Sequence, residues 1–297
     1  MLRLAAGPGD PSQAPPSAIT VGQVTVVAWP AQAALAVDLG REAGRSVDWP
    51  GLGRSIPGAI RLIIVPDGRR LDSLTNGRAP HWGAAIALPE NRTILLRADQ
   101  GDLIRTLRHE LAHLALHEQV PVRVPLWFDE GYAAWAAGEW DRFRALELNV
   151  AVARGSIPTF TALDGALRSS ASTAEVAYAL AVSAVAELAR RNPSGTLRPL
   201  LARLRGGADF DAAVVASTGL SLDRFEGEWR RVIKRRYSLG AWLVAGGGWG
   251  VLALILWGLV RLRHRSDRTR RDALDHGWNV APEDTNGTEL DPTPQRW

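Results

Sequence analysis

Cysteine is absent from the 297-residue sequence, and methionine, tyrosine and lysine are scarce, with one, three and one residues respectively. The lack of cysteine excludes disulfide bonds, thiolate metal ligands and a cysteine nucleophile. A metal site in this chain would therefore need histidine and carboxylate ligands. The single lysine stands against 34 arginines, which indicates a compositional preference rather than phosphate recognition.

The overall composition is that of a folded protein with a sizeable core. Hydrophobic residues make up 46% of the chain and charged residues 22%. These proportions exclude a disordered tail, a collagen-like fibre and a multi-span membrane protein. The length suits one large domain or two small ones.

Basic charge is concentrated in one short segment. The formal net charge is +4, but residues 234–271 hold nine basic residues and one acid, so this segment carries +8 and the rest of the chain −4. A nucleic-acid-binding domain would carry its basic charge on the folded part. We therefore expect no nucleic-acid partner.

The basic segment surrounds an apolar stretch at residues 239–260, which contains no charged residue. As a helix, its 22 residues would be roughly 33 Å long, enough to cross a bilayer. Trp242 and Trp257 lie near its ends, where indoles favour the membrane interface. A buried core helix is the alternative, but arginines on both sides favour one transmembrane helix and contacts with lipid headgroups.

The orientation of this span is less strongly indicated, because basic residues flank both of its ends equally. Large domains cross membranes largely regardless of charge, which favours an extracytoplasmic domain and a cytoplasmic tail at residues 261–297. This tail is basic at first and then has a composition typical of disorder. Residues 1–17 lack an apolar signal segment, so they are interpreted as a disordered or truncated leader. The protein is expected at the cell membrane as a single-pass protein.

Strand and helix patterns divide the chain into an α/β first third and a helical remainder. Strands are predicted at residues 19–29, 59–65, 82–88 and 93–97, the last two as a hairpin, with helices at 30–45 and, briefly, up to residue 74. Further helices are predicted at residues 102–118, 129–140, 142–154, 174–191, 197–204, 210–217 and 222–237. The fold class is therefore α+β, with a small mixed N-terminal sheet and an all-helical C-terminal half, and residues 18–236 are expected to form one domain.

The long predicted helix contains the pattern HExxH, at His109-Glu110-Leu111-Ala112-His113. The spacing of four residues places both imidazoles on one helix face, so they can share one metal ion. Glu110 points to the neighbouring side and can reach a metal-bound water without ligating the metal. Zinc hydrolysis uses this arrangement, since the metal lowers the pKa of water toward ~7 and the glutamate takes the proton.

Apolar residues of the same helix argue against two incidental surface histidines. Ile104, Leu107, Leu111, Leu114 and Ala115 are expected to dock this helix in the core. The two histidines then lie at the edge of the buried face, where unpaired imidazoles would be poorly solvated.

A catalytic zinc site needs a third protein ligand and one open position. Glu130 is the candidate, 17 residues after His113. The rival carboxylate, Asp129, is interpreted as the N-cap of the next helix. His117 continues the spacing of four, but it lies about 12 Å along a straight helix from His109, so both cannot bind one ion and His117 is expected on the surface.

Taken together, these motifs resemble the gluzincin metallopeptidases, and in particular bacterial peptidase MA-like domains. The resemblance covers roughly residues 18–236. It rests on HELAH followed by Trp127-x-x-Glu130-Gly131-x-Ala133, and also on the strand and turn at 61–67, the hairpin at 82–96, the helix opened by 177–179, the helix at 197–204 and the segment 219–229 that ends in Trp229.

This resemblance implies a zincin-like fold and one Zn²⁺ per chain, held by His109, His113 and Glu130, with Glu110 as the general base. It also implies that the edge strand of the hairpin binds an extended peptide or protein substrate by main-chain hydrogen bonds. Tyr178 matches a tyrosine that stabilises the oxyanion in such enzymes, although an anchor that satisfies a core hydrogen bond is the alternative.

One departure from the family pattern concerns the partners of the metal ligands. Ala134 stands four residues after Glu130, where a carboxylate that orients one histidine is expected. Any carboxylate that orients His109 or His113 must therefore come from elsewhere in the chain.

Two functions of different class remain open. The first is a membrane-anchored zinc metallopeptidase. The second is a catalytically silent, membrane-tethered module with the same fold that binds peptides or partner proteins. The intact HExxH motif favours the first, because a module without chemistry has no need of a general base.

Overall fold

The computed structural model describes residues 14–55, 58–77, 83–139, 148, 157–237 and 248–276. Several expectations lie outside them: the leader up to residue 13, the helix at 142–154 apart from Leu148, the first nine residues of the predicted span, and the tail from 277. Contacts divide the chain into two units, Met1–Ala241 and Trp242–Trp297. Each unit is described by itself.

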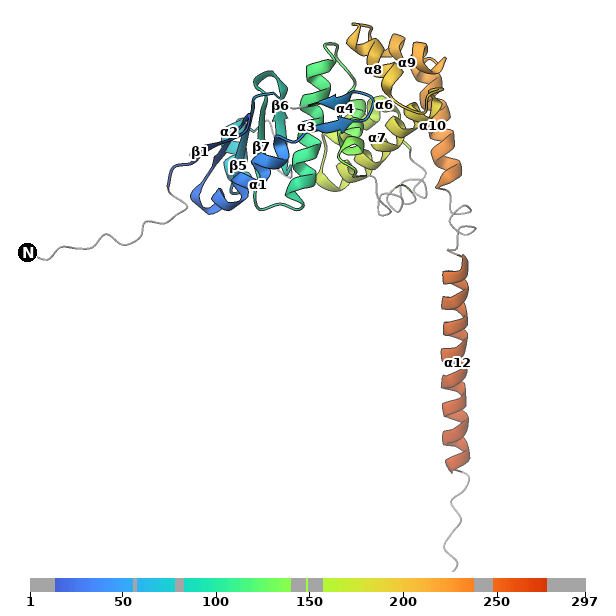
Figure 1. The fold of residues 1–297 in the computed structure, drawn as a ribbon. Coiled ribbons are helices and arrows are strands. Elements are labelled where there is room, and N and C mark those ends of the chain that lie inside the picture. The colour runs from blue at the N-terminus through green and yellow to red at the C-terminus, as the bar shows by residue number, and fades with distance from the viewer. Residues whose placement is uncertain are drawn as a thin grey trace, which may run out of the picture. The chain divides into compact units, whose positions relative to one another are not determined.

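A five-stranded mixed sheet forms the N-terminal part of the first unit (Figure 1). Its order is β1 (Ser17–Val21), β2 (Val24–Ala28), β5 (Ile60–Val65), β7 (Thr93–Arg97) and β6 (Ala85–Leu88). The central pairs β2–β5 and β5–β7 are parallel, and the outer pairs β1–β2 and β7–β6 are antiparallel. The predicted small mixed sheet is confirmed, and β6 is one of its edges.

The first predicted strand, at residues 19–29, is wrong as a single element. It is a hairpin of β1 and β2, which reverses at Gly22 and Gln23. Gly22 has φ of 60°, a left-handed conformation that glycine adopts without steric cost. The alternating valines and threonines on both sides of this turn read as one continuous strand.

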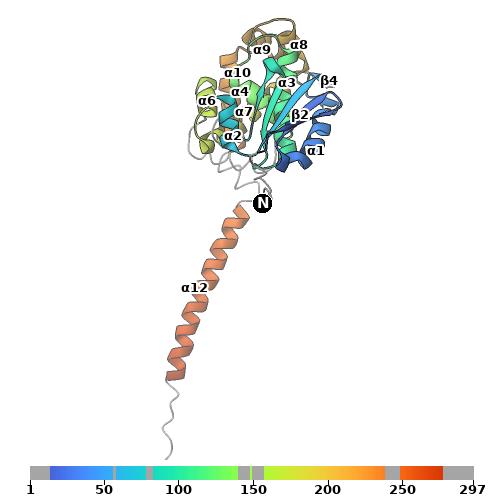
Figure 2. The ribbon, with the colours of Figure 1, turned by 90° about the vertical axis from the view of Figure 1, so that its left-hand side faces the viewer.

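Helices cover both faces of the sheet. Side chains alternate between the two faces along each strand, and apolar side chains on both faces are buried. Leu62, Ile64, Ile94 and Leu96 belong to the main core, where α1 (Ala33–Ala43) and α3 (Leu103–Gln119) pack. Side chains on the opposite face, including Leu95, pack with Leu71 of α2 (Gly68–Thr75). Helix α3 packs against β6 and β7, and α1 and α2 lie on either side of the sheet (Figure 2).

The rest of the first unit is helical, as predicted, and packs around α4 and α7. Its elements are α4 (Leu126–Ala136), α6 (Phe160–Leu167), α7 (Ala171–Arg191), α8 (Arg198–Arg205), α9 (Phe210–Thr218) and α10 (Leu222–Arg236). Helix α6 has no counterpart in the sequence prediction. Helix α4 begins three residues before, and ends four residues before, the predicted bounds of 129 and 140.

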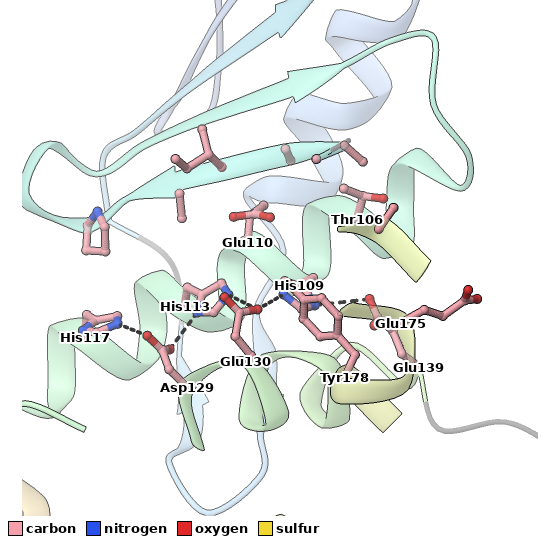
Figure 3. A pocket seen from close by; sticks show the side chains of 17 residues that line it. Thr106, His109, Glu110, His113, His117, Asp129, Glu130, Glu139, Glu175 and Tyr178 are labelled. Carbon is pink, nitrogen blue, oxygen red and sulfur yellow. Dashed lines mark hydrogen bonds and ion pairs between the residues drawn. The ribbon is translucent and has the colours of Figure 1, made fainter. Parts of the chain in front are cut away.

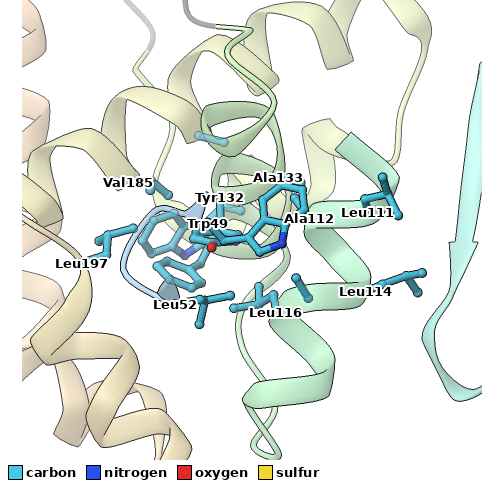
Figure 4. Close-up of a cluster of buried hydrophobic side chains, with 14 of the residues drawn as sticks. Trp49, Leu52, Leu111, Ala112, Leu114, Leu116, Tyr132, Ala133, Val185 and Leu197 are labelled. Carbon is cyan, nitrogen blue, oxygen red and sulfur yellow. The ribbon is translucent and has the colours of Figure 1, made fainter. Parts of the chain in front are cut away.

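A small hairpin of β3 (Val47–Trp49) and β4 (Gly53–Ser55), which the sequence did not indicate, inserts Trp49 and Leu52 into the helical core (Figure 4). Tyr132 of α4 is fully buried there and donates its hydroxyl to the carbonyl of Pro50 at 3.1 Å. This contact ties the segment that follows α1 to the helix that carries Glu130.

Among the described residues, one helix is long and apolar enough to cross a membrane, and it is α7. Buried residues make up 61% of its apolar window, because α7 packs against α4 and α6. This is the behaviour of a core helix. The predicted span at 239–260 is only partly described, as the start of α12 (Gly248–His276) in the second unit, so it stays a prediction.

Candidate metal centre

Helix α3 carries the HExxH motif, with His109 and His113 on the side that faces α4. Its N-cap is Asp102, whose side chain accepts a hydrogen bond from the amide of Arg105 at 3.1 Å, as the aspartate at its start predicted. Leu107, Leu111 and Leu114 are buried in the core. Ile104 is an exception to the predicted apolar face, since it is 49% exposed.

The structure brings His109, His113 and Glu130 together (Figure 3). The Nε2 atoms of His109 and His113 lie 3.4 and 3.7 Å from the same oxygen, Oε2 of Glu130. The centres of the two imidazole rings are 4.9 Å apart. One ligand atom from each of the three residues lies within 4.8 Å of the other two. Two nitrogens and one oxygen therefore converge on one point.

The opposite nitrogen of each ring faces a second carboxylate. Nδ1 of His109 lies 3.2 Å from Oε1 of Glu139, and Nδ1 of His113 lies 2.7 Å from Oδ1 of Asp129. A carboxylate at Nδ1 favours the tautomer with the proton on that atom, and so leaves Nε2 free to accept a metal ion. These are the orienting carboxylates that the sequence did not reveal.

Asp129 lies in the first turn of α4, and the prediction that it caps this helix is wrong. Pro125 occupies the N-cap position, and no side chain caps the helix there. Instead, the second oxygen of Asp129 lies 2.8 Å from Nε2 of His117. His117 thus stays out of the His109–His113–Glu130 group and buttresses the carboxylate that orients His113.

Glu139 reaches His109 because α4 ends sharply. The amide of Gly138 donates to the carbonyl of Trp135, and that of Glu139 donates to the carbonyl of Ala134, at 3.1 and 3.0 Å. Gly138 has φ of 74°. This is a Schellman motif, which turns the chain out of the helix after a left-handed glycine. It brings Glu139 back toward the helix that it follows.

In the absence of a metal, protonated histidines balance the negative charge of the carboxylates in the site. Burial opposes the charged form of His109, but hydrogen bonds to Glu130 and Glu139 outweigh it and raise the pKa of His109 to about 10. Burial also opposes ionisation of Glu130, yet both histidines lower the pKa of its carboxyl to about 2. The arrangement suits two positive charges beside Glu130, and a divalent cation supplies the same charge.

Glu110 lies apart from the converging ligand atoms, between α3 and β6 (Figure 3). Only 7% of this residue is exposed, and burial raises the pKa of its carboxyl. The backbone amide of Ala87 in β6 donates a hydrogen bond to it. A carboxylate held close to the metal ligands without joining them has the position of a general base.

Tyr178 lies on the other side of the ligands, in the second turn of α7 rather than at the start of this helix. Its ring centre is 6.2 Å from that of His109, and its hydroxyl donates a hydrogen bond to Glu130. Burial raises the pKa of this phenol well above its usual value. The hydroxyl therefore keeps its proton at neutral pH and remains a hydrogen-bond donor.

A cleft of about 630 Å³ joins these residues. Residues 83–87, at and before the free edge of β6, form one wall, and His109, His113 and Tyr178 line the opposite side. Such an edge offers backbone amides and carbonyls to an extended chain, and of these the amide of Ala87 is already bound to Glu110. Glu130, Glu139 and Glu175 also line the cleft.

Comparison with known families agrees with this geometry. The model of the peptidase MA superfamily matches residues 72–235, a range that holds α3, α4, α7 and every residue of the site. No curated protein matches the sequence. Because the family match covers more than half of the 297 residues, the chain belongs to the peptidase MA superfamily.

Proposed function

We propose that this protein is a membrane-anchored, zinc-dependent metallopeptidase of the gluzincin type with a zincin-like fold. The observation that carries the proposal is the convergence of Nε2 of His109 and Nε2 of His113 on Oε2 of Glu130. Family membership supports peptidase chemistry in general, and the donor atoms support the choice of metal.

Two imidazole nitrogens and one carboxylate oxygen fit zinc, which uses such sets of three protein ligands in catalytic sites and keeps a fourth position open. His109, His113 and Glu130 would hold one ion per chain, and all three line the cleft. When bound, zinc lowers the pKa of a water molecule and polarises the carbonyl of the scissile bond.

Glu110 then acts as the general base. Its carboxyl is buried, with a raised pKa, so it accepts a proton more readily than an exposed glutamate does. It takes the proton of the attacking water and delivers it to the nitrogen of the leaving amine. The hydrogen bond from Ala87 holds this carboxylate next to the strand against which the peptide lies.

Tyr178 stabilises the oxyanion that develops on the scissile carbonyl. Its hydroxyl is protonated and now donates to Glu130, so a rotation toward the cleft would redirect the same donor to substrate oxygen. The edge of β6 binds the extended peptide by main-chain hydrogen bonds, with the backbone groups that Glu110 does not occupy. These interactions require little of the substrate side chains.

The zinc content of purified protein and a Glu110→Gln variant test the mechanism. Wild type is expected to bind one zinc per chain and to cleave peptides from a diverse library. Glu110→Gln should keep the zinc and lose hydrolysis by at least about a hundredfold. The control is Glu118→Gln on the same helix, where the carboxylate pairs with Arg92 on the surface; it should retain activity.

Retained hydrolysis in Glu110→Gln would remove this glutamate as the base. Stoichiometric zinc without cleavage by wild type would instead favour the peptide-binding module. The membrane anchor at residues 239–260 is tested by protease accessibility of the large domain in intact cells. Digestion from outside supports an extracytoplasmic domain with a cytoplasmic tail, and protection supports the reverse.

A further inference from the structure

A second cavity, of about 570 Å³, adjoins the end of the cleft where His117 lies. Both cavities are lined by His117 and Asp129, so they meet at this pair. The second cavity lies between the loop at residues 120–125, which joins α3 to α4, and the C-terminal part of α6. A peptide that runs along the cleft past His117 would reach this second cavity.

Two guanidinium groups line this cavity. Arg123 comes from the loop between Pro121 and Pro125, and Arg168 is the C-cap of α6. Both are exposed. In the part of the chain that the structure describes, neither arginine forms an ion pair, as the carboxylates nearby are engaged elsewhere.

Asp129 and Asp164 are the carboxylates that share the cavity with these arginines. The two oxygens of Asp129 lie 2.7 and 2.8 Å from His113 and His117. Asp164 accepts the backbone amide of Trp127 at 2.7 Å, at the start of α4. The arginines thus keep donors that suit an incoming carboxylate.

The opposite end of the cleft carries acidic side chains. Glu175 and Glu139 lie there, with Thr106, on the side away from His117 (Figure 3). Among the residues that the structure describes, no arginine or lysine lines the main cleft. Glu175 and Glu139 disfavour a negatively charged group at that end, whereas Arg123 and Arg168 offer it hydrogen-bond donors in the second cavity.

We infer that Arg123 and Arg168 form a subsite for a carboxylate of the peptide substrate, and this inference rests on the proposed function. His117 is one helical turn, about 6 Å, beyond His113, and an extended peptide advances about 3.3 Å per residue. The substrate residue that bears the carboxylate therefore lies about two to four residues from the scissile bond. Either an acidic side chain or the C-terminal carboxylate supplies this chemistry.

Paired peptides test the subsite with the full-length, zinc-loaded protein. In each pair, Glu replaces Gln at one position up to four residues on either side of the scissile bond, and a further pair compares a C-terminal carboxylate with an amide. Wild type should prefer one carboxylate peptide by about tenfold in kcat/KM. The ratio should fall to near one in Arg123→Ala/Arg168→Ala, and it should stay at tenfold in Arg203→Ala, which removes an exposed arginine of α8.

Binding provides a readout that does not depend on turnover. Zinc-loaded Glu110→Gln and its triple variant with Arg123→Ala and Arg168→Ala bind the same fluorescent peptides in an anisotropy titration, and the ratio of Kd values should change as kcat/KM does. Cleavage without a carboxylate preference, or a preference that survives the double substitution, overturns the subsite. Charge-dependent binding without cleavage by wild type keeps the subsite and overturns the proposed peptidase.

Discussion

Nδ1 of His109 lies 3.2 Å from Oε1 of Glu139, a residue 30 positions further along the chain. This contact connects a metal-ligand candidate to the end of the helix that carries Glu130. This chain has Ala134 at the position where the family pattern places an orienting carboxylate. In its place, the turn after α4 supplies the carboxylate of Glu139, five residues after Ala134.

Replacement of Glu139 should therefore weaken metal binding without removing a ligand. Glu139→Ala is expected to lower zinc affinity about 10- to 100-fold, because the imidazole of His109 loses the group that fixes its orientation and tautomer. Competition with a chromogenic chelator measures this affinity. Glu175→Gln is the control, because Glu175 lines the same cleft but forms no hydrogen bond with His109 or His113. An equal loss in both variants would contradict the role of Glu139.

Zinc binding at pH 7 should release nearly two protons. Without metal, hydrogen bonds to carboxylates raise the pKa of His109 to about 10 and that of His113 well above its usual value, whereas Glu130 is already ionised. Both imidazoles must lose a proton to bind a metal. Calorimetric titrations in buffers of different ionisation enthalpy count these protons, and a value near zero would show that the histidines are neutral in the metal-free protein.

The metal-free protein should lose stability at alkaline pH. The pKa of His109 is raised from 6.5 to about 10 on folding. The charged imidazole therefore adds to the free energy of unfolding in full below pH 6.5, and this stabilisation disappears as the pH rises through 10. Melting temperatures between pH 6 and 10, in chelator and in zinc, measure this difference. The decline should be larger in chelator than in zinc, and smaller in His109→Gln than in wild type; equal declines would be against a buried imidazolium.

Removal of the Tyr178 hydroxyl should slow the reaction and leave the metal in place. Tyr178→Phe is expected to lower kcat about 10- to 1000-fold, since a lost oxyanion donor acts on the transition state, with little change in KM or zinc content. Steady-state kinetics and metal analysis of the same preparation check both parts. A loss of zinc that parallels the loss of activity would support the alternative role of Tyr178 as an anchor for Glu130.

Close contact between α4 and α7 depends on Gly131. A Cβ atom at this position would lie 2.6 Å from the carbonyl oxygen of Ala181, so the two helices would have to separate. Gly131→Ala should lower the free energy of unfolding by about 1–3 kcal/mol. Gly165→Ala in α6 has open space around its new methyl group and should be neutral or stabilising by about 0.5–1 kcal/mol; urea denaturation without metal compares them.

Periodic patterns predicted the scaffold of the site well. The cap at Asp102 and the spacing of leucines located α3 to within a residue, and the local HExxH pattern gave His109, Glu110 and His113 one helix face. The third position, Glu130, followed from the resemblance and from its distance along the chain. The structure places these four residues around one cleft.

The partners of the ligands were harder to predict, because each depends on where a helix ends. Asp129 was interpreted as a cap since the start of α4 was placed three residues too late. Glu139 was hidden because the same helix was extended past Gly138, although a glycine after an apolar helix is a signal for a Schellman motif. Arg123 and Arg168 lie in a loop and at a helix end, and only the tertiary structure brings them to one cavity.

The free edge of β6 also bears on self-association. An open strand edge can pair with the same edge of a second copy, which is a common route to aggregation. Here β6 has only four residues and is followed by Pro89, which lacks an amide hydrogen. Glutamates line the cleft in front of it, so two copies that approach edge to edge bring like charges together. The short edge can thus remain open to a single extended chain while it discourages the stacking of β-sheets between molecules.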